Sequence, residues 1–251
     1  MATEIPRHKK TTAYWDAQAP WQQIWLEHND YHQETLRFLR EKVQPGWRVL
    51  DIGAGNGVLA LPLQQWGCRV TALEPSQGMR HLLKSEIRRR QTTLEKIDRR
   101  RWEEVPVEEL WEFDLILASN SLQLSTLGFQ AALLKMFAPE PRQVCVITEM
   151  GFPEISLVAD YGDYRLSSSR QFQVDSSYAY RHLHEAWDHL AHRLGRSPTI
   201  REKGEIKRKL VQKNNHFWLK GTSRVEIFWW IRQKENRGIK CSRRTGKSGF
   251  Y

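Results

Sequence analysis

The stretch WRVLDIGAGNGVLAL, residues 47–61, is the part of this sequence that decides its fold. Residues 48–52 carry Val, Leu and Ile and predict a short buried strand. Gly53, Gly55 and Gly57 follow at alternate positions, and an apolar helical pattern begins directly after them. Glycine is needed where the backbone has a positive φ or passes close to a ligand. Such a loop presents backbone N–H groups and the positive end of a helix dipole at the carboxyl edge of the sheet.

Asp51 lies inside this strand, two residues before the first glycine. Dinucleotide-binding loops have the spacing G-x-G-x-x-G and hold a pyrophosphate, whereas the spacing here is G-x-G-x-G. A carboxylate at this position repels phosphate and suits a cationic or amine-bearing ligand. The pattern resembles the D-x-G-x-G-x-G motif of class I S-adenosylmethionine-dependent methyltransferases, whose cofactor carries an ammonium and a sulfonium group. The alternative is a purely structural strand-turn-helix unit of another α/β protein.

A second acidic residue stands at the end of the next predicted strand, residues 69–73. Glu74 follows Gly53 by 21 positions, close to the ~20 residues at which an acid binds ribose hydroxyls in nucleotide-binding folds. Ser76 is a suitable N-cap for a helix from residue 77 to about residue 90. Glu74 is therefore expected to be the second anchor of the site.

The resemblance covers about residues 43–149 and implies a Rossmann-like, doubly wound α/β sheet with S-adenosylmethionine as the cofactor. It implies that the glycine loop lines the methionine moiety, that Asp51 faces the ammonium group and that Glu74 holds the ribose. The cofactor-binding residues expected from the motifs are Asp51, Gly53, Ala54, Gly55, Gly57, Glu74, Pro75, Ser76, Trp102 and Asn120.

The loop after the third predicted strand, residues 93–97, holds adenine in related methyltransferases, usually with an acid followed by a small residue. Here Arg101 and Trp102 occupy those positions, which departs from the family pattern. Asp98 or Glu103 is the expected substitute for the acid. Trp102 either packs against the purine face or belongs to the core, and both interpretations stay open at this point.

The fourth predicted strand, residues 114–118, leads into the segment NSLQ at residues 120–123. Its carboxyl end faces the methyl-transfer centre in this fold. Methyltransferases that modify exocyclic amines of bases carry N-P-P-Y here, and those that modify a pyrimidine carbon carry Pro-Cys. Neither motif is present, which argues against those acceptors. A helix at residues 127–137 and a fifth strand at residues 143–149 complete the alternation.

Length and composition favour one elaborated α/β domain. The 251 residues include 40% apolar side chains and eleven tryptophans, enough for a sizeable core. No run of about 18 apolar residues predicts a membrane span, and the N-terminal MATEIPRHKK lacks the apolar core of a signal peptide. Three widely spaced cysteines fit a reduced cytoplasm and no zinc site. A cytoplasmic location is therefore expected.

Positive charge gathers at the C-terminal end. The net charge is +10, and residues 232–251 alone contain seven Lys or Arg and one Glu. This segment has almost no apolar periodicity and is expected to be disordered. Such a tail either binds nucleic acid or another anionic surface, or it is a solvated end without a partner.

Helical segments are expected on both sides of the core. Residues 11–43 predict helices interrupted at Pro20, with Tyr14 and Trp15 either over the cofactor pocket or packed on the sheet edge. Later elements are expected as helices at 155–164, 178–194 and 199–213, a strand at 172–174, and a hairpin of 216–219 with 224–231. The expected division is an N-terminal helical segment 1–46, a cofactor-binding core 47–150, a substrate-covering insertion 151–215, a closing hairpin 216–231 and a basic tail 232–251.

Four side chains with metal-binding or proton-transfer chemistry recur at helical spacing, namely His182, Glu185, His189 and His192. Imidazole and carboxylate groups on one helix face can bind zinc, and a histidine over the pocket could remove a proton from the acceptor. The bland alternative is a solvated lid face with a Glu185–His189 pair. No metal site is predicted from this pattern.

The function that the resemblance implies is in-line displacement at the sulfonium methyl group, for which the protein mainly supplies orientation and desolvation. A small-molecule acceptor is expected, because no base-modification motif is present. RNA or protein methylation through the basic tail is one alternative. A non-catalytic, cofactor-binding regulatory module is another.

Overall fold

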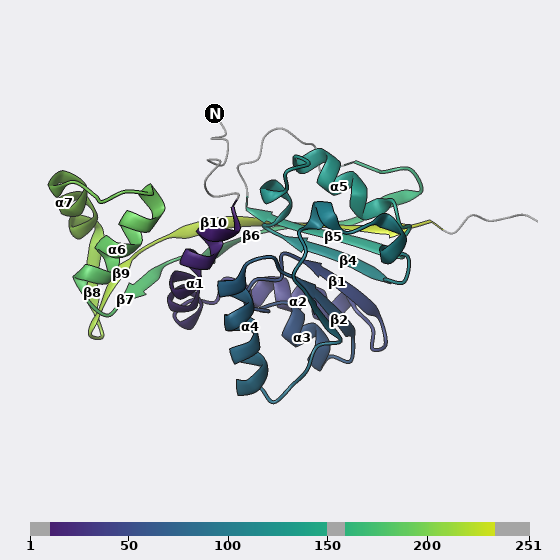
Figure 1. The fold of residues 1–251 in the computed structure, drawn as a ribbon, viewed down its shortest axis with the longest axis horizontal. Helices are drawn as coiled ribbons and strands as arrows, with labels where there is room; N and C mark the ends of the chain where they lie inside the picture. The colour runs from purple at the N-terminus through teal and green to yellow at the C-terminus, as the bar shows by residue number, and fades with distance from the viewer. Residues whose placement is uncertain (1–10, 150–158, 234–251) are drawn as a thin grey trace, which may run out of the picture.

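A seven-stranded sheet forms the centre of the computed structural model, which describes residues 11–149 and 159–233 (Figure 1). Its strand order is β3-β2-β1-β4-β5-β10-β6. The strands are β1 Arg48–Ile52, β2 Arg69–Leu73, β3 Lys96–Asp98, β4 Leu115–Ser119, β5 Gln143–Glu149, β6 Tyr164–Asp175 and β10 Thr222–Arg232. The first five run parallel, and β10 is antiparallel to both β5 and β6. The predicted doubly wound, mostly parallel α/β class is confirmed.

Helices cover both faces of this sheet because successive strand side chains point to opposite sides. In β1, Val49 packs into one apolar cluster with α2 and α3, whereas Leu50 and Ile52 pack into a second cluster with α5. The helices on the core are α1 Thr12–Glu27, α2 Gln33–Lys42, α3 Ala60–Gln65, α4 Gln77–Arg89 and α5 Phe129–Phe137. Ser76 caps α4 as expected, since its hydroxyl accepts a hydrogen bond from the Met79 N–H at 3.1 Å.

Helix α1 does not break at Pro20, contrary to the sequence-based prediction. Proline removes the N–H that would donate to the carbonyl of Asp16, one turn earlier. That carbonyl instead lies beside Gly78 of α4, where a Cβ atom would come within 2.7 Å of the Asp16 oxygen. Packing of α1 on α4 therefore holds the helix through the proline.

A small second unit projects from the end of the long antiparallel pair β6–β10 (Figure 1). Residues 176–221, called the insertion below, form β7 Tyr178–Tyr180, α6 Leu183–Leu194, α7 Ile200–Lys209, β8 Leu210–Lys213 and β9 His216–Leu219. The three short strands make a separate antiparallel sheet in the order β7-β9-β8. Asp175 and Thr222, which flank the insertion, are paired directly across the ladder.

The expected hairpin of residues 216–219 with 224–231 is wrong. β9 pairs with β7 and β8 in the small sheet, whereas β10 pairs with β5 and β6 in the large one. The closing pair of the core sheet is instead β6 with β10, and β6 extends well beyond the strand expected at 172–174. Short-range spacing favoured the neighbouring segments, but β10 has buried apolar side chains on both faces, as suits an inner strand of the large sheet, whereas no residue of β9 is buried.

Three other expected elements change at their ends. The helix expected at 178–194 begins as β7, and the helix expected at 199–213 ends at Lys209 and continues as β8. Of the helix expected at 155–164, residues 155–158 lie outside the described residues, and Tyr164 begins β6. Residues 234–251 of the basic tail also lie outside them. Within the described ranges, every helix is too short or too polar to cross a bilayer.

Candidate functional site

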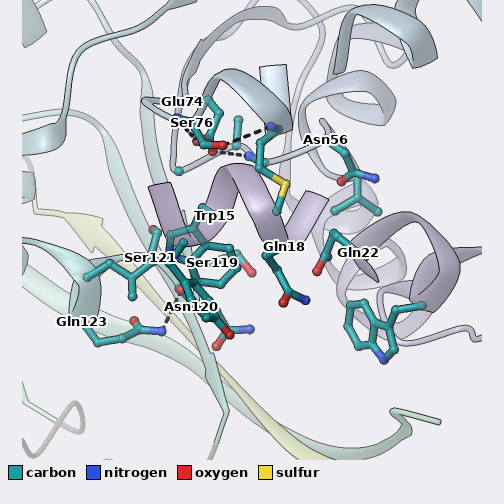
Figure 2. A pocket seen from close by; sticks show the side chains of 18 of the residues that line it. Trp15, Gln18, Gln22, Asn56, Glu74, Ser76, Ser119, Asn120, Ser121 and Gln123 are labelled. Atoms are coloured by element: carbon teal, nitrogen blue, oxygen red, sulfur yellow. Dashed lines mark hydrogen bonds between the residues drawn. The ribbon is translucent and has the colours of Figure 1, made fainter. Parts of the chain in front are cut away.

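A cavity of about 920 Å³ lies at the carboxyl ends of β1, β2 and β4. This edge is where open α/β sheets bind their ligands. The glycine loop, the ends of β2 and β4, helix α1 and the insertion all contribute to its wall. Figure 2 shows side chains from these core elements and from α1 around the same cavity. The volume is near the upper end of the roughly 300–1,000 Å³ typical of small-ligand sites, so it has room for more than one ligand group.

Nine of the ten expected cofactor-binding residues line this cavity, and Gly57 is the exception. Those nine are Asp51, Gly53, Ala54, Gly55, Glu74, Pro75, Ser76, Trp102 and Asn120. Gly57 has φ +81°, and a Cβ atom there would lie 2.3 Å from Leu83 Cδ1 of α4. Gly57 is therefore required for the close packing of the loop on α4. The sequence motif alone does not distinguish this packing role from a role in ligand binding.

The glycine loop is held rigidly by backbone and side-chain contacts. Gly53 has φ +70° and donates its N–H to the carbonyl of Leu73 at 2.8 Å. A Cβ atom on Gly53 would lie 2.5 Å from Ser121 Cβ. The Ser121 hydroxyl in turn donates to the Ile52 carbonyl at 2.6 Å. Glycine is required at position 53 because the end of β4 approaches the loop so closely.

Glu74 is a buried carboxylate fixed by two backbone donors. Its Oε2 accepts from the Gly55 N–H at 2.8 Å and its Oε1 from the Ser76 N–H at 2.7 Å (Figure 2). Burial raises the pKa of Glu74, and these two hydrogen bonds oppose the rise. Each oxygen retains a second lone pair, so the carboxylate can still accept hydroxyl donors from a ligand.

Asp51 is also buried, but it lacks such compensation. Asp51 is 1% exposed, and its Oδ2 atom has no hydrogen-bond partner among the described residues. Burial raises the pKa of Asp51 to about 7, and the neighbouring Glu74 charge adds to the rise. An unpartnered buried carboxylate oxygen is costly unless a ligand supplies a donor or a positive charge. The site therefore fits the ammonium and sulfonium groups of S-adenosylmethionine.

The expected substitutes for the adenine-binding acid are both engaged elsewhere. Asp98 is outside the cavity lining and is bound by the Arg100 guanidinium, with Nη2 2.7 Å from Oδ2. This pairing holds its pKa well below the usual range. Glu103 lines the cavity, but its oxygens accept from the Thr126 hydroxyl at 2.8 Å and the Ser125 hydroxyl at 3.2 Å. The two carboxylates therefore stabilise the surrounding loops in this structure.

Trp102 belongs to the core of the α5 face while also bordering the cavity. Its side chain is 5% exposed, and its indole N–H donates to the Ala132 carbonyl at 3.0 Å. The Lys135 ammonium lies 4.5 Å from the ring centroid and covers part of the indole. The core interpretation of Trp102 therefore fits the structure better than an exposed stacking platform.

Helix α1 forms the wall opposite the glycine loop and is tied to α4 next to the site. Asp16 Oδ1 accepts from the Ser76 hydroxyl at 2.6 Å and from the Gly78 N–H at 2.9 Å. Tyr14 and Trp15 both line the cavity. Gln18 lines it too, is 6% exposed, and has no hydrogen-bond partner for Oε1 among the described residues. Of the two interpretations of Tyr14 and Trp15, the structure matches the one over the pocket.

The histidine face of the insertion helix is not one cluster. Glu185 accepts from the Arg181 backbone N–H at 2.7 Å and from its guanidinium, and His182 lies 3.8 Å away. His189 is buried, stacks on Trp21 and shares a hydrogen bond of 2.7 Å with the Tyr180 hydroxyl. Burial lowers the pKa of His189 to about 3. Across residues 11–149 and 159–233, no group of three His, Cys, Asp or Glu is placed to hold a metal ion.

Among the cavity residues that were not expected from the sequence are Tyr31 and Glu149. Tyr31 precedes α2, Glu149 ends β5, and both line the cavity beside Asn120. Glu149 could have been predicted from its position at the carboxyl end of β5, because the carboxyl ends of parallel strands lie at the same edge of the sheet and polar residues at the ends of β2 and β4 were already expected in the site. Tyr31 carries no such signal, since its loop reaches the site only through the tertiary fold.

Comparison with known proteins identifies the central region. Residues 49–138 match a family model described as a methyltransferase domain. The chain is 38% identical over 93 residues to a ubiquinone biosynthesis O-methyltransferase of Methylocella silvestris, a match that covers 34% of this chain. It is 36% identical over 96 residues, or 36% of its length, to an uncharacterised protein of Haemophilus influenzae. The match spans about a third of the length of each relative, 33% in both cases.

A likeness to solved structures extends further along the chain. The fold resembles that of a candidate RNA methyltransferase of Pyrococcus horikoshii, with a TM-score of 0.52 and 15% identity. That alignment covers 84% of this chain and 89% of the other. At 15% identity the likeness concerns the fold alone. Because the alignment covers 84% of this chain, the likeness in fold extends beyond residues 49–138.

Proposed function

Because residues 49–138 match a family model of methyltransferase domains, we propose that this chain is an S-adenosylmethionine-dependent methyltransferase acting on a small-molecule acceptor. The observation that carries the cofactor assignment is the pair of buried acids at the ends of β1 and β2. Glu74 links the glycine loop to α4 through the Gly55 and Ser76 N–H groups, and Asp51 beside it has an unpartnered oxygen. A ribose and an ammonium group satisfy these two carboxylates, whereas a pyrophosphate would be repelled.

The residues of this chain orient the cofactor and exclude water from it. Gly53 and Gly55 allow close approach of the ligand, Glu74 accepts the ribose hydroxyls, and Asp51 compensates the positive charge. When bound, S-adenosylmethionine supplies a methyl group that is already activated for transfer. Helix α1 and the insertion also line the cavity, and we expect them to limit the access of water to the bound cofactor.

A small acceptor is favoured by the shape of the site. The space left beside the cofactor-binding residues is bordered by α1, the insertion and the ends of β4 and β5. The chain also lacks the N-P-P-Y and Pro-Cys motifs at residues 120–123 that mark base-modifying enzymes. The similarity to a ubiquinone biosynthesis O-methyltransferase over the cofactor-binding region is compatible with a small acceptor.

Calorimetry with S-adenosylhomocysteine, the demethylated cofactor, tests this proposal. Wild-type protein should bind it, and Glu74→Ala should weaken binding by roughly 1–3 kcal/mol, because charge-assisted ribose hydrogen bonds are lost. Glu86→Gln is a matched control, since Glu86 pairs with Arg89 on the outer part of α4 and is absent from the cavity lining. Absence of binding heat at millimolar ligand, or equal effects of the two substitutions, would contradict the cofactor assignment.

RNA is a second candidate acceptor, and the charge of the insertion favours it. Residues 196–220 contain eight Lys or Arg and two Glu. Lys207, Arg208 and Lys209 are basic residues of the last turn of α7, and Lys220 lines the cavity.

Incubation with methyl-labelled cofactor should label a metabolite extract and leave total RNA unlabelled. Label in RNA that is lost with Lys207, Arg208 and Lys209 changed to Gln would instead support the RNA acceptor. Cofactor binding with no labelled product would favour the non-catalytic module.

A further inference from the structure

Asn120, Tyr31 and Glu149 form a closed hydrogen-bond network at the carboxyl ends of β4 and β5. The Tyr31 hydroxyl donates to Glu149 Oε1 at 2.7 Å. Asn120 Nδ2 donates to the Tyr31 oxygen at 3.1 Å, and Asn120 Oδ1 accepts from the Glu149 backbone N–H at 2.9 Å. Asn120 has φ +50°, a conformation that asparagine tolerates better than most residues. Three separate chain segments thus fix one carboxylate in one orientation.

The network leaves one oxygen of Glu149 available. Tyr31 is 2% exposed, and burial raises the pKa of its hydroxyl, with the Glu149 charge adding to the rise. The hydroxyl therefore stays protonated and occupies Oε1 as a donor. No residue in the described ranges donates a hydrogen bond to Oε2, and half-buried Glu149 lines the cavity. An oriented carboxylate with one open oxygen has the geometry of a proton acceptor.

Flat rings surround the space next to this carboxylate. The ring of Trp25 lies 4.6 Å from that of Tyr31, 5.9 Å from that of His32 and 6.3 Å from that of Tyr178, measured between centroids. All four side chains line the cavity. Such walls favour an aromatic ligand over an aliphatic one, because stacked and edge-on ring contacts add to the burial of apolar area.

A positively charged side chain, Arg193, also lines the cavity. Arg193, in the last turn of α6, lines the cavity and forms no ion pair within the described part of the chain. Burial raises the pKa of Tyr178 to about 12, with the Arg193 charge opposing the rise and the Glu149 charge adding to it. Tyr178 is therefore within electrostatic range of both groups. The cavity wall thus carries a carboxylate, Glu149, and a guanidinium, Arg193, both near Tyr178.

We propose that this part of the cavity binds the methyl acceptor, and that the acceptor is a small aromatic compound with an ionisable hydroxyl facing Glu149 and an anionic substituent facing Arg193. This inference rests on the proposed methyltransferase function. In the transfer, the acceptor oxygen bonds to the methyl carbon as the carbon–sulfur bond breaks and its electron pair remains on sulfur. The hydroxyl proton passes to Glu149 Oε2. Glu149 is the catalytic residue, and Tyr31 and Asn120 are positioning residues.

Binding of three matched probes to protein saturated with S-adenosylhomocysteine tests the assignment without requiring the natural acceptor. 4-Hydroxyphenylacetate carries both groups, phenylacetate lacks the hydroxyl, and 4-hydroxyphenylacetamide lacks the charge. The first probe should bind about tenfold more tightly than either of the others, which corresponds to about 1.4 kcal/mol per lost group. Equal binding of the three probes, or no binding at millimolar concentrations, would overturn the proposal.

Variants assign each preference to its residue. Glu149→Gln should remove the preference for the hydroxyl, and Arg193→Gln should remove the preference for the carboxylate. Glu226→Gln on β10 and Arg196→Gln, whose side chain pairs with Glu202, are controls that should change neither. The proposed orientation would be contradicted if Glu149→Gln removed the preference for the carboxylate and Arg193→Gln the preference for the hydroxyl, or if neither variant changed either preference.

Tyr31→Phe distinguishes positioning from simple packing. The variant keeps the ring but loses the donor to Glu149, so the preference for 4-hydroxyphenylacetate over phenylacetate should fall while the affinity for phenylacetate stays unchanged. An unchanged preference, or an equal loss of affinity for both probes, would show that Tyr31 has only a structural role and would overturn its assignment. Binding of S-adenosylhomocysteine is measured first in every variant. If that binding is present while the probes fail to discriminate, only the acceptor inference fails, whereas its absence in the wild type refutes the proposed function.

Discussion

Asp51 and Glu74 show how burial and local donors set the electrostatics of this site. Both carboxylates are buried at the ends of neighbouring parallel strands, and the Glu74 charge adds to the cost of ionising Asp51. Two backbone N–H groups offset the cost of burial for Glu74, whereas Oδ2 of Asp51 has no donor within the described residues. Asp51 is therefore the group whose charge state depends most on a bound cation.

The raised pKa of Asp51 predicts a specific dependence of stability on pH. Between about pH 4, the usual value for an unfolded Asp, and about pH 7, the folded chain holds a proton that the unfolded chain has released. The free energy of unfolding contributed by this group should therefore fall as pH rises through that window, by an amount on the order of 2–4 kcal/mol. Urea unfolding of wild type and Asp51→Asn at about pH 4.5 and about pH 8 measures the effect. An equal pH dependence in both proteins would contradict it.

Gly55 and Gly57 have similar positive φ angles but different surroundings. A Cβ atom on Gly55 would meet nothing within 4 Å, because the residue borders the cavity, whereas one on Gly57 would overlap Leu83. Gly55→Ala should cost about 1–2 kcal/mol of stability from backbone strain and weaken S-adenosylhomocysteine binding about tenfold. Gly57→Ala should cost more stability, about 2–4 kcal/mol, with little change in the affinity of the folded protein. The reverse pattern would assign Gly57 to the ligand.

At the scale of elements, α1 and α4 meet at a contact that proline and glycine make possible together. Pro20 leaves the Asp16 carbonyl without its usual helical donor, and Gly78 allows α4 to approach that carbonyl. The Asp16 carboxylate then binds Ser76 and the Gly78 N–H, directly beside Glu74. The position of α1 over the cavity therefore depends on a close backbone contact.

Gly78→Ala should reverse the usual effect of this substitution in a helix. Its Cβ would lie 2.7 Å from the Asp16 oxygen and 2.9 Å from Asp16 Cα, so the two helices must separate. The expected loss of stability is about 1–3 kcal/mol. Gly204→Ala in α7 is the matched control, because its nearest neighbour would be Arg208 Nη1 at 3.8 Å. It should stabilise the protein by about 0.5–1 kcal/mol, as alanine does in an open helix position. Urea unfolding compares the two, and stabilisation by both would refute the contact.

At the scale of the whole molecule, the insertion is a separate unit joined to the core by the β6–β10 pair (Figure 1). It contacts α1 through the hydrogen bond from the Trp25 indole N–H to the Ser176 carbonyl at 3.1 Å. It also supplies Tyr178 and Arg193 to the cavity, whereas the buried acids of the cofactor region belong to the core. The proposed acceptor site thus draws on both units, whereas the buried acids of the proposed cofactor site come from the core alone.

Replacing residues 176–221 with an Asn-Gly turn tests this division. Asp175 and Thr222 are directly opposite in the ladder, so a two-residue hairpin turn can join them. The shortened protein should fold and bind S-adenosylhomocysteine within about tenfold of the wild type, but it should lose the preference for the carboxylate-bearing probe, because Arg193 is removed. Changing Lys207, Arg208 and Lys209 to Gln in the full chain is the control and should leave probe binding unchanged. Loss of cofactor binding in a folded, shortened protein would show that the insertion belongs to the cofactor site.

Local chemistry in the sequence was enough to predict the first half of the fold and one end of the cavity. The bounds of β1, β2 and β5 and the capped start of α4 follow from apolar runs, glycines and a serine whose effects extend over a few residues. The glycine spacing and the distance to Glu74 identify the cofactor region for the same reason. Their assignment to a ligand stays a prediction.

Only the tertiary structure decided the rest, because the decisive contacts join distant segments. β10 pairs with β6 across the whole insertion, and the neighbouring β9 belongs to another sheet, a choice set by which surface buries each apolar face. The Tyr31 hydroxyl meets Glu149 across 118 positions of sequence, and Trp102 points its indole N–H into the core. The sequence therefore determined how the glycine-loop end of the cavity is built, whereas long-range packing decided which side chains line the proposed acceptor site.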